Sequence, residues 1–287
     1  MSYLEIPAYA KINLSLDVIC RREDGYHELR TIMQTVSLHD TICLDTSLEA
    51  GIRLECGDCR VPEDMTNTAW RAAKLVMDKF GIKSGLRIRI IKRIPVAAGM
   101  AGGSTDAAAV LRGLNELFSL GLDTDELRAL GKQIGADVPY CIEGGTKLAE
   151  GIGEILTPLP DFSGVDVVIV KPDIGVSTPW VYKNLDLSKI TDRDRPDTEQ
   201  IIDSLAKKDV AGVAAGMKNV LESVTLRSYE VVRQAKNRMD EAGALGSLMS
   251  GSGPCVFGLF EDKESARRAF EELSACRMWQ CHISETI

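Results

Sequence analysis

The chain has 287 residues, of which 45% are hydrophobic and 26% are charged, and this composition is typical of a globular protein with one large or two ordinary domains. Its net charge of -8 disfavours a general nucleic-acid binder, and no apolar run reaches the roughly 20 residues that cross a bilayer. The first residues lack the basic and apolar parts of a signal peptide. We therefore expect a cytoplasmic monomer or weak homodimer that binds a small molecule and neither nucleic acid nor membrane.

The N-terminal region is predicted to be rich in β-strands. Apolar residues alternate with polar ones from residue 12 to residue 18, which indicates a half-buried strand and places Lys11 and Asn13 on the face that points away from the core. A turn at residues 22–25 leads to a second strand. Further along we expect strands over residues 41–44, 52–56 and 86–90, a helix over residues 67–80, and a second helix that carries Ala107, Leu111, Leu114 and Phe118.

The second half of the chain is predicted to mix strands and helices. A helix over residues 125–134 ends at Gly135, a turn or a new helix start follows at residues 136–139, and residues 144–156 resemble a hairpin. Prolines and a glycine between residues 158 and 164 predict a domain boundary, with domains at 1–160 and 161–287. Beyond it we expect strands over residues 166–170, 245–249, 255–260 and 278–283, and helices over residues 198–209, 223–242 and 263–275.

The eight cysteines are spread along the chain, which fits a reducing compartment better than a disulfide scaffold. Cys56 and Cys59 have the spacing of metal ligands, but the pair Cys276 and Cys281 does not repeat it. The intervening Gly57-Asp58 is typical of a hairpin turn. We therefore predict a turn here and no metal site.

A glycine-rich loop joins the strand at residues 86–90 to the next helix. Its sequence is Pro95-Val-Ala-Ala-Gly-Met-Ala-Gly-Gly-Ser-Thr-Asp-Ala-Ala-Ala109. Such a loop exposes backbone N–H groups at a helix N-terminus, where phosphate is favoured, and Ser104 and Thr105 add hydroxyl donors. The loop lacks the Lys of Gly-x4-Gly-Lys-Ser/Thr and the spacing of Gly-x-Gly-x-x-Gly. Taken alone, it is either a phosphate-binding loop or a tight strand-to-helix turn.

Three motifs in order resemble those of the GHMP kinase superfamily, named for galactokinase, homoserine kinase, mevalonate kinase and phosphomevalonate kinase. They are Ala8-Tyr-Ala-Lys-Ile-Asn-Leu14, the glycine-rich loop, and Leu248-Met-Ser-Gly-Ser-Gly-Pro-Cys-Val-Phe257. The resemblance covers nearly the whole chain and implies an α+β fold with an N-terminal ribosomal-protein-S5-domain-2-like domain and a C-terminal ferredoxin-like domain. It also implies an ATP-dependent small-molecule kinase with an alcohol acceptor. Mg²⁺ should accompany ATP, because phosphoryl transfer generally needs a metal ion that bridges the β- and γ-phosphate oxygens of ATP.

Three further stretches narrow the resemblance: Ala10-Lys-Ile-Asn13, Asp24-Gly-Tyr-His27 and Ile134-Gly-Ala-Asp-Val-Pro139. They are similar to one branch of the superfamily, which serves the non-mevalonate isoprenoid pathway and phosphorylates the C2 hydroxyl of an acceptor with a cytidine diphosphate group. Two alternatives remain open. Another GHMP kinase, such as homoserine or mevalonate kinase, would not need a clamp for the base, and a non-catalytic nucleotide-binding regulator could dispense with a catalytic acid–base pair.

Lys11 and Asp137 match the catalytic pair of this branch. The resemblance implies that Asp137 orients the acceptor hydroxyl and takes its proton, while Lys11 keeps the carboxylate ionised and offsets charge on the phosphoryl group. These roles require the two side chains to lie close together. Read without the resemblance, Lys11 is a solvated strand residue and Asp137 is a helix cap or an Asx turn before Pro139.

The resemblance also assigns the substrate contacts. It implies that Tyr26 stacks on the cytosine ring and that His27 hydrogen-bonds the edge of the base. Tyr182 matches an aromatic on the other face of the ring, although alone it reads as a partly buried surface residue. Asn13 shares the face of Lys11 and is expected to touch the substrate.

The ATP contacts are expected on the glycine-rich loop, and Asn67 and Lys92 match positions near the adenine and ribose. The loop residues are Pro95, Val96, Ala97, Ala98, Gly99, Met100, Ala101, Gly102, Gly103, Ser104 and Thr105. The three alanines replace glycines of some relatives, and their methyl groups fit if φ stays below zero. Asp106 reads as a first-turn acid that favours the helix N-terminus. Gly251-Ser-Gly253 is predicted to form a tight hairpin closed by Pro254, which the resemblance places against the site.

Overall fold

The computed structural model describes residues 3–287, and the chain divides by its contacts into two compact units. Unit 1 holds residues 3–10, 39–96 and 101–144, and unit 2 holds residues 11–38, 97–100 and 145–287. The long strands β1 (Tyr3–Arg21) and β2 (His27–Ser47) each contribute to both units. Because these strands are continuous, the units do not follow a single cut in the sequence, and the division at residue 160 stays a prediction.

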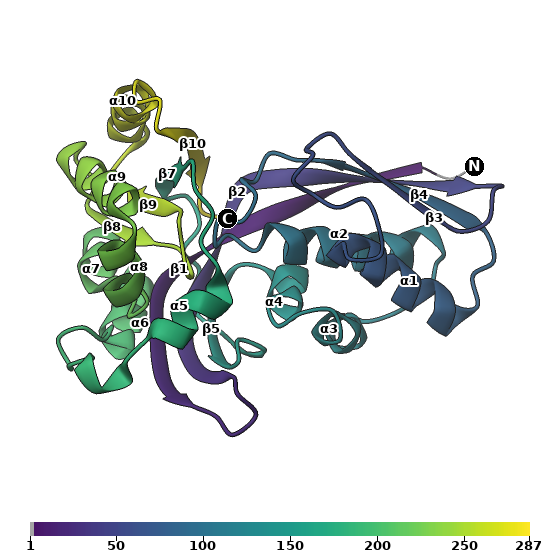
Figure 1. Ribbon diagram of the computed structural model, residues 1–287, viewed down its shortest axis with the longest axis horizontal. Coiled ribbons are helices and arrows are strands. Elements are labelled where there is room, and N and C mark those ends of the chain that lie inside the picture. Colours follow the sequence, from purple (N-terminus) through teal and green to yellow (C-terminus); the bar gives the residue numbers. More distant parts are fainter. Residues whose placement is uncertain (1–2) are drawn as a thin grey trace. The chain divides into compact units, whose positions relative to one another are not determined.

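Unit 1 is a sheet covered on one face by helices (Figure 1). The second half of β2 pairs antiparallel with β4 (Gly85–Ile91), and β4 pairs in parallel with β3 (Ile52–Cys56). The apolar residues Leu86, Ile88 and Ile90 of β4 alternate with exposed residues and join the core of the unit. The covering helices are α1 (Thr68–Phe80), α2 (Gly102–Leu117), α3 (Thr124–Lys132) and α4 (Val138–Glu143).

Local signals set the helix ends of unit 1. The Asn67 side chain accepts a hydrogen bond from Ala69 N and begins α1, which ends at Gly81 in the left-handed conformation. Asp123 and Glu126 form a capping box at the start of α3. The predicted helix over residues 67–80 and the predicted strands over residues 52–56 and 86–90 are confirmed.

Unit 2 contains a four-stranded antiparallel sheet with the order β10-β7-β9-β8. These strands are β7 (Asp166–Pro172), β8 (Gly246–Met249), β9 (Val256–Leu259) and β10 (Trp279–Glu285). Helices α9 (Glu230–Glu241) and α10 (Lys263–Ser274) pack against the sheet (Figure 1). Val167–Val170 is an unbroken run of buried residues in β7, as expected for a strand covered on both faces.

The rest of unit 2 comprises a hairpin and several short helices. β5 (Thr146–Gly151) pairs with both β2 and β6 (Ile155–Pro158), which confirms the predicted hairpin. The short helices are α5 (Thr178–Asn184), η1 (Leu187–Lys189), α6 (Thr198–Ala206), α7 (Val210–Gly216) and α8 (Glu222–Ser228). In residues 3–287 no helix has both the length and the apolar character that a membrane crossing requires.

Four expectations from the sequence are wrong. The helix over residues 223–242 is two helices, because Tyr229 is extended at φ −127° and ψ 92° and separates α8 from α9. The run at residues 41–44 is the end of β2, not a separate strand. Gly57-Asp58 is not a hairpin turn, since β3 is followed by α1. The polar face of β1 is not open to solvent, because Lys11 is 5% and Asn13 1% exposed.

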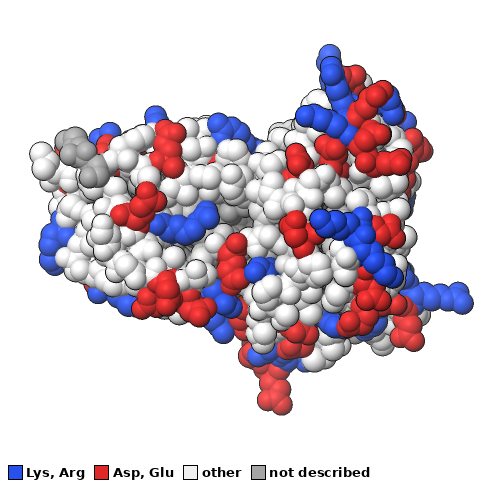
Figure 2. Space-filling model, turned by 180° about the vertical axis from the view of Figure 1, so that it is seen from behind, with Lys and Arg blue, Asp and Glu red and all other residues white. Residues whose placement is uncertain are grey.

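The charged surface is mixed. On the face shown in Figure 2, Lys and Arg side chains lie among Asp and Glu side chains and form no large patch of one sign. Within α10, for example, Arg268 pairs with Glu264 and Arg267 pairs with Glu271 at helical spacing. Such paired charges are typical of a solvated helix face.

Candidate active site

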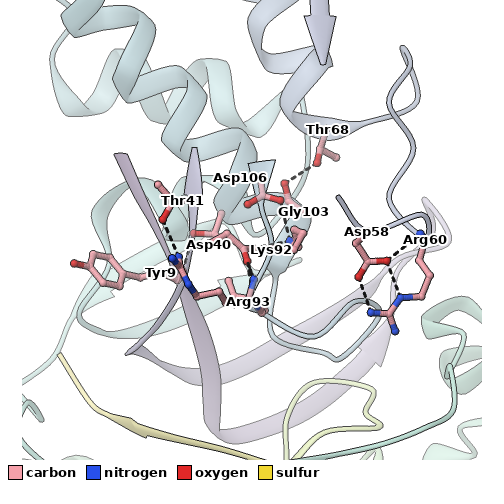
Figure 3. A network of polar contacts seen from close by, with 12 residues as sticks. Tyr9, Asp40, Thr41, Asp58, Arg60, Thr68, Lys92, Arg93, Gly103 and Asp106 are labelled. Carbon is pink, nitrogen blue, oxygen red and sulfur yellow. Dashed lines mark hydrogen bonds and ion pairs between the residues drawn. The ribbon is translucent and has the colours of Figure 1, made fainter. Parts of the chain in front are cut away.

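Lys92 lies in unit 1 between two carboxylates (Figure 3). Its Nζ is 2.5 Å from Asp40 Oδ2 and 3.0 Å from Asp106 Oδ2. Asp40 Oδ1 also accepts hydrogen bonds from the backbone N–H groups of Arg93 and Ile94. A Cβ added at Gly102 would lie 3.3 Å from Lys92 Nζ. The ammonium therefore lies against the start of α2 and is paired inside the protein.

The Asp40, Lys92 and Asp106 side chains carry one excess negative charge when all are ionised, and all three are almost fully buried. Burial raises the pKa of Asp106 to about 7, and the nearby Asp40 carboxylate adds to the shift against the opposing effect of Lys92. Burial alone would lower the pKa of Lys92, but the two carboxylates outweigh it and raise that pKa. Asp106 Oδ1 is buried with no hydrogen-bond partner among the described residues, which agrees with a proton on this carboxyl near neutrality.

In the glycine-rich loop, two alanines have the left-handed backbone conformation that usually favours glycine. Ala97 has φ 54° and Ala101 has φ 58°, so the expectation that the loop alanines keep φ below zero is wrong at these two positions. The left-handed conformation costs an L-residue roughly 1–2 kcal/mol. The two alanines adopt this conformation in spite of its cost. Strained residues of this kind persist where the surrounding structure holds them in place.

We expect Ala97→Gly and Ala101→Gly each to raise the free energy of unfolding by about 0.5–1 kcal/mol, because the relief of left-handed strain exceeds the added entropy of glycine in the unfolded chain. Urea unfolding measures the change. Ala98→Gly is the matched control, since Ala98 is buried and has no positive φ, and it should destabilise instead. A lower free energy of unfolding in all three variants would contradict the claim that Ala97 and Ala101 are strained.

The start of α2 is anchored by side chains of unit 1. Thr68 Oγ1 donates a hydrogen bond of 2.6 Å to Gly103 O, a contact visible in Figure 3. Thr105 Oγ1 donates to Tyr9 O at 2.7 Å, and Thr105 N donates to Ala101 O at 2.9 Å. Both donors of Thr105, a predicted phosphate contact, are therefore engaged within the unit.

Lys11 contacts the loop within unit 2. Lys11 Nζ donates to Asn13 Oδ1 at 2.7 Å and to Gly99 O at 3.4 Å. Asn13 Nδ2 in turn donates to Thr31 Oγ1. Ser250 Oγ, from the third motif, donates to the same Gly99 carbonyl at 2.9 Å. The structure thus brings one residue from each of the three sequence motifs together around Gly99.

Asp137 stands at the first turn of α4 in unit 1. It occupies the N-cap position, yet its side chain makes no capping hydrogen bond, so the simple reading of this carboxylate as a helix cap is wrong. Its backbone carbonyl accepts from Cys141 N. Asp137 and Lys11 belong to different units, and the closeness of their side chains stays a prediction.

Two of the three predicted base-binding residues meet in unit 2. The rings of His27 and Tyr182 have centroids 4.9 Å apart and are tilted by 31°. Burial, with a smaller effect of Arg21, lowers the pKa of His27, so the imidazole is neutral at pH 7 and offers one donor and one acceptor. Tyr26 is 60% exposed, and its ring is accessible for stacking.

Unit 1 contains a pocket of about 490 Å³ lined by residues 57–59 and 89–92. Arg60 pairs with Asp58 beside it and lowers the pKa of that carboxyl to about 2. Lys92, predicted near the nucleotide, lies in the lining, whereas Asn67 uses its amide to cap α1 and to donate to Pro62 O. Apart from the Cys56–Cys59 spacing, no sequence motif marks this pocket. Asp40 lies in the middle of β2 and belongs to no motif.

Known protein families match both halves of the chain. Residues 67–145 match the family model of the GHMP kinases N terminal domain, and residues 201–277 match that of the GHMP kinases C terminal. The chain is 53% identical over its full length to 4-diphosphocytidyl-2-C-methyl-D-erythritol kinase of Acetivibrio thermocellus, with all of that protein covered. It is 52% identical over 94% of its length to the enzyme of the same name from Clostridium perfringens, of which 93% is covered.

Solved structures give the same result. A crystal structure of 4-(cytidine 5'-diphospho)-2C-methyl-D-erythritol kinase aligns with a TM-score of 0.85 and 36% identity over 99% of both chains. The homoserine kinase of Cytophaga hutchinsonii aligns with a TM-score of 0.79 over 100% of this chain and 95% of that chain, but at 19% identity it shares only the fold. The fold is the predicted two-domain α+β fold, and the chain belongs to the GHMP kinase family.

Proposed function

We propose that this chain transfers the γ-phosphoryl group of ATP to the C2 hydroxyl of 4-diphosphocytidyl-2-C-methyl-D-erythritol, a step in the formation of isoprenoid precursors. The observation that carries the proposal is the full-length match, at 53% identity, to a kinase named for this substrate. The contact between His27 and Tyr182 supports it, because a neutral imidazole beside an aromatic ring suits recognition of a pyrimidine base.

ATP is proposed to bind with its phosphates at the loop of residues 95–105. Gly102 begins α2, which has 16 residues, and its first N–H groups and helix dipole favour anionic oxygens. Gly102 and Gly103 allow a phosphate to approach the backbone closely. The adenosine is proposed to lie in the pocket that Lys92 helps to line. The Lys92 ammonium, paired with Asp40, lies against the start of α2 and thereby stabilises the end of the loop.

Asp137 is proposed to take the proton of the acceptor hydroxyl as that oxygen attacks the γ-phosphorus. The bond from the γ-phosphorus to the oxygen that bridges it to the β-phosphate breaks, and ADP leaves. Lys11 is proposed to stabilise the charge on the transferred group, since it is held at Gly99 O and Asn13 Oδ1. Asn13 fixes the Lys11 ammonium and orients the acceptor.

The acceptor is proposed to place its cytosine at Tyr26, His27 and Tyr182. Tyr26 and Tyr182 supply ring faces, and His27 supplies one donor and one acceptor for the edge of the base. Residues 3–287 contain no group of three or more His, Cys, Asp or Glu side chains placed to hold a metal. Mg²⁺ would accompany ATP and would neutralise charge on its phosphates.

The test is ADP release from Mg-ATP with four separate acceptors: 4-diphosphocytidyl-2-C-methyl-D-erythritol, homoserine, mevalonate and galactose. We expect turnover with the first alone. Tyr182→Ala should raise KM for this acceptor about tenfold or more, since aromatic stacking on a base is worth about 1–3 kcal/mol, and should leave KM for ATP unchanged. Turnover with only homoserine, mevalonate or galactose would refute the substrate assignment. No turnover with any of the four acceptors would favour a non-catalytic nucleotide-binding regulator.

A further inference from the structure

Asn219 lies in unit 2 between α7 and α8, outside all three sequence motifs, and is 4% exposed. Its Nδ2 donates to Met249 O and to Gly251 O, each at 2.8 Å. Its Oδ1 accepts from Leu221 N at 3.0 Å. Both amide hydrogens and the amide oxygen are thus used, and only an amide supplies two donors and one acceptor in this arrangement.

The turn that Asn219 holds, residues 250–253, lies directly against Gly99. Ser250 Oγ donates to Gly99 O at 2.9 Å. A Cβ on Gly99 would lie 2.2 Å from Ser250 O, and a Cβ on Gly251 would lie 3.2 Å from Gly99 O. Because backbone touches backbone here, a displacement of the turn must move Gly99 or break the Ser250 hydrogen bond.

Asn219 is itself fixed to the strand that carries Lys11. Leu16 N donates to Lys218 O at 2.9 Å, and Val220 N donates to Leu16 O at 3.0 Å. These two bonds form a parallel bridge between Leu16 and Asn219. A closed set of contacts therefore runs from β1 through Asn219 to the turn, from the turn to Gly99, and from Gly99 O back to Lys11 Nζ.

We propose that Asn219 is a positioning residue for phosphoryl transfer. It holds the turn at residues 250–253 against Gly99, and it thereby fixes the position of Gly99 in the glycine-rich loop relative to Lys11. This inference rests on the proposed function. Asn219 reaches the loop through the turn, so its loss should weaken ATP binding and turnover without weakening acceptor binding.

Asn219→Asp tests the proposal, because it keeps the shape but turns an oxygen toward two carbonyl oxygens. We expect kcat/KM for ATP to fall 10- to 100-fold, as small misplacements of reacting groups produce, with KM for the acceptor unchanged. A protonated carboxyl regains one donor, and burial favours that form. The deficit should therefore shrink as the pH is lowered from 8 to 6.

Asn115→Asp is the matched control, since Asn115 Nδ2 donates to Leu122 O and its Oδ1 accepts from Leu122 N, both at 2.9 Å. It should lower the free energy of unfolding but leave kcat/KM for ATP unchanged. If Asn219→Asp does not fold, Ser250→Ala replaces it and removes only the hydroxyl that reaches Gly99 O. Ser250→Thr should then restore the affinity for ATP.

Equal effects of the Asn219 and Asn115 substitutions on kcat/KM for ATP would overturn the proposal, as would an acceptor KM that rises with the KM for ATP. Equilibrium binding of ATP separates this failure from failure of the proposed function. If the wild-type chain binds ATP but phosphorylates no acceptor, the function is wrong. A 10-fold or greater loss of ATP affinity in Asn219→Asp would still support the positioning role, and unchanged affinity would overturn it.

Discussion

Replacement of Asp137 by Asn is expected to lower kcat by about 10²- to 10⁴-fold, the usual contribution of a general base. The amide keeps the size of the side chain but cannot take the proton of the acceptor hydroxyl. The free energy of unfolding should change little, because Asn keeps the size of the side chain and is as suitable as Asp at the N-cap position that residue 137 occupies. ADP release at saturating ATP and acceptor measures the first quantity, and urea unfolding measures the second.

Asp123→Ala provides the comparison for this experiment. Asp123 accepts a hydrogen bond from Glu126 N in the capping box of α3, so its truncation should lower the free energy of unfolding by about 0.5–2 kcal/mol and leave kcat unchanged. The two variants together separate an acid that performs chemistry from one that caps a helix. A wild-type kcat in Asp137→Asn would remove Asp137 from the proposed mechanism.

The sequence was sufficient for features that depend on neighbouring residues. The period-two pattern of β4 and the apolar pattern of α1 are local, and the structure has both elements where they were expected. The three motifs could be aligned by order alone, and in the structure Lys11 Nζ and Ser250 Oγ both donate to the carbonyl of Gly99. Motif order therefore predicted the family, and the roles of the site residues stay predictions.

The sequence was insufficient for features that depend on unusual backbone conformations or on contacts between residues far apart in the chain. Alanine ordinarily avoids positive φ, so nothing in the loop sequence predicted the left-handed Ala97 and Ala101. Tyr229 is compatible with a helix, so its residue type did not predict the extended conformation that separates α8 from α9. Asn219 carries no motif, and its partners at residues 249 and 251 become visible only in the fold.

Replacement of Lys92 by Met is expected to lower the free energy of unfolding at pH 8 by about 3–5 kcal/mol, the usual result of removing one partner of a buried ion pair. The two nearly fully buried carboxylates of Asp40 and Asp106 would then be left without their cation. Urea unfolding at pH 8 measures the loss. Lys74→Met is the control, because Lys74 and Asp78 form an exposed pair on α1, which contributes little to stability.

The pH dependence of this defect follows from Asp106. Its pKa is raised from 3.8 to about 7 in the folded chain, so between these values the folded chain holds a proton that the unfolded chain has released. Stability from this group is therefore present at low pH and is lost as the pH rises toward 7. Without Lys92, which lowers the pKa of Asp106, that pKa should rise further. The defect of Lys92→Met should therefore be smaller at pH 5 than at pH 8. Asp106→Asn cannot ionise, so in the Lys92→Met background it should remove most of this difference between pH 5 and pH 8. An equal loss of stability at both pH values in Lys92→Met alone would contradict the protonation of Asp106.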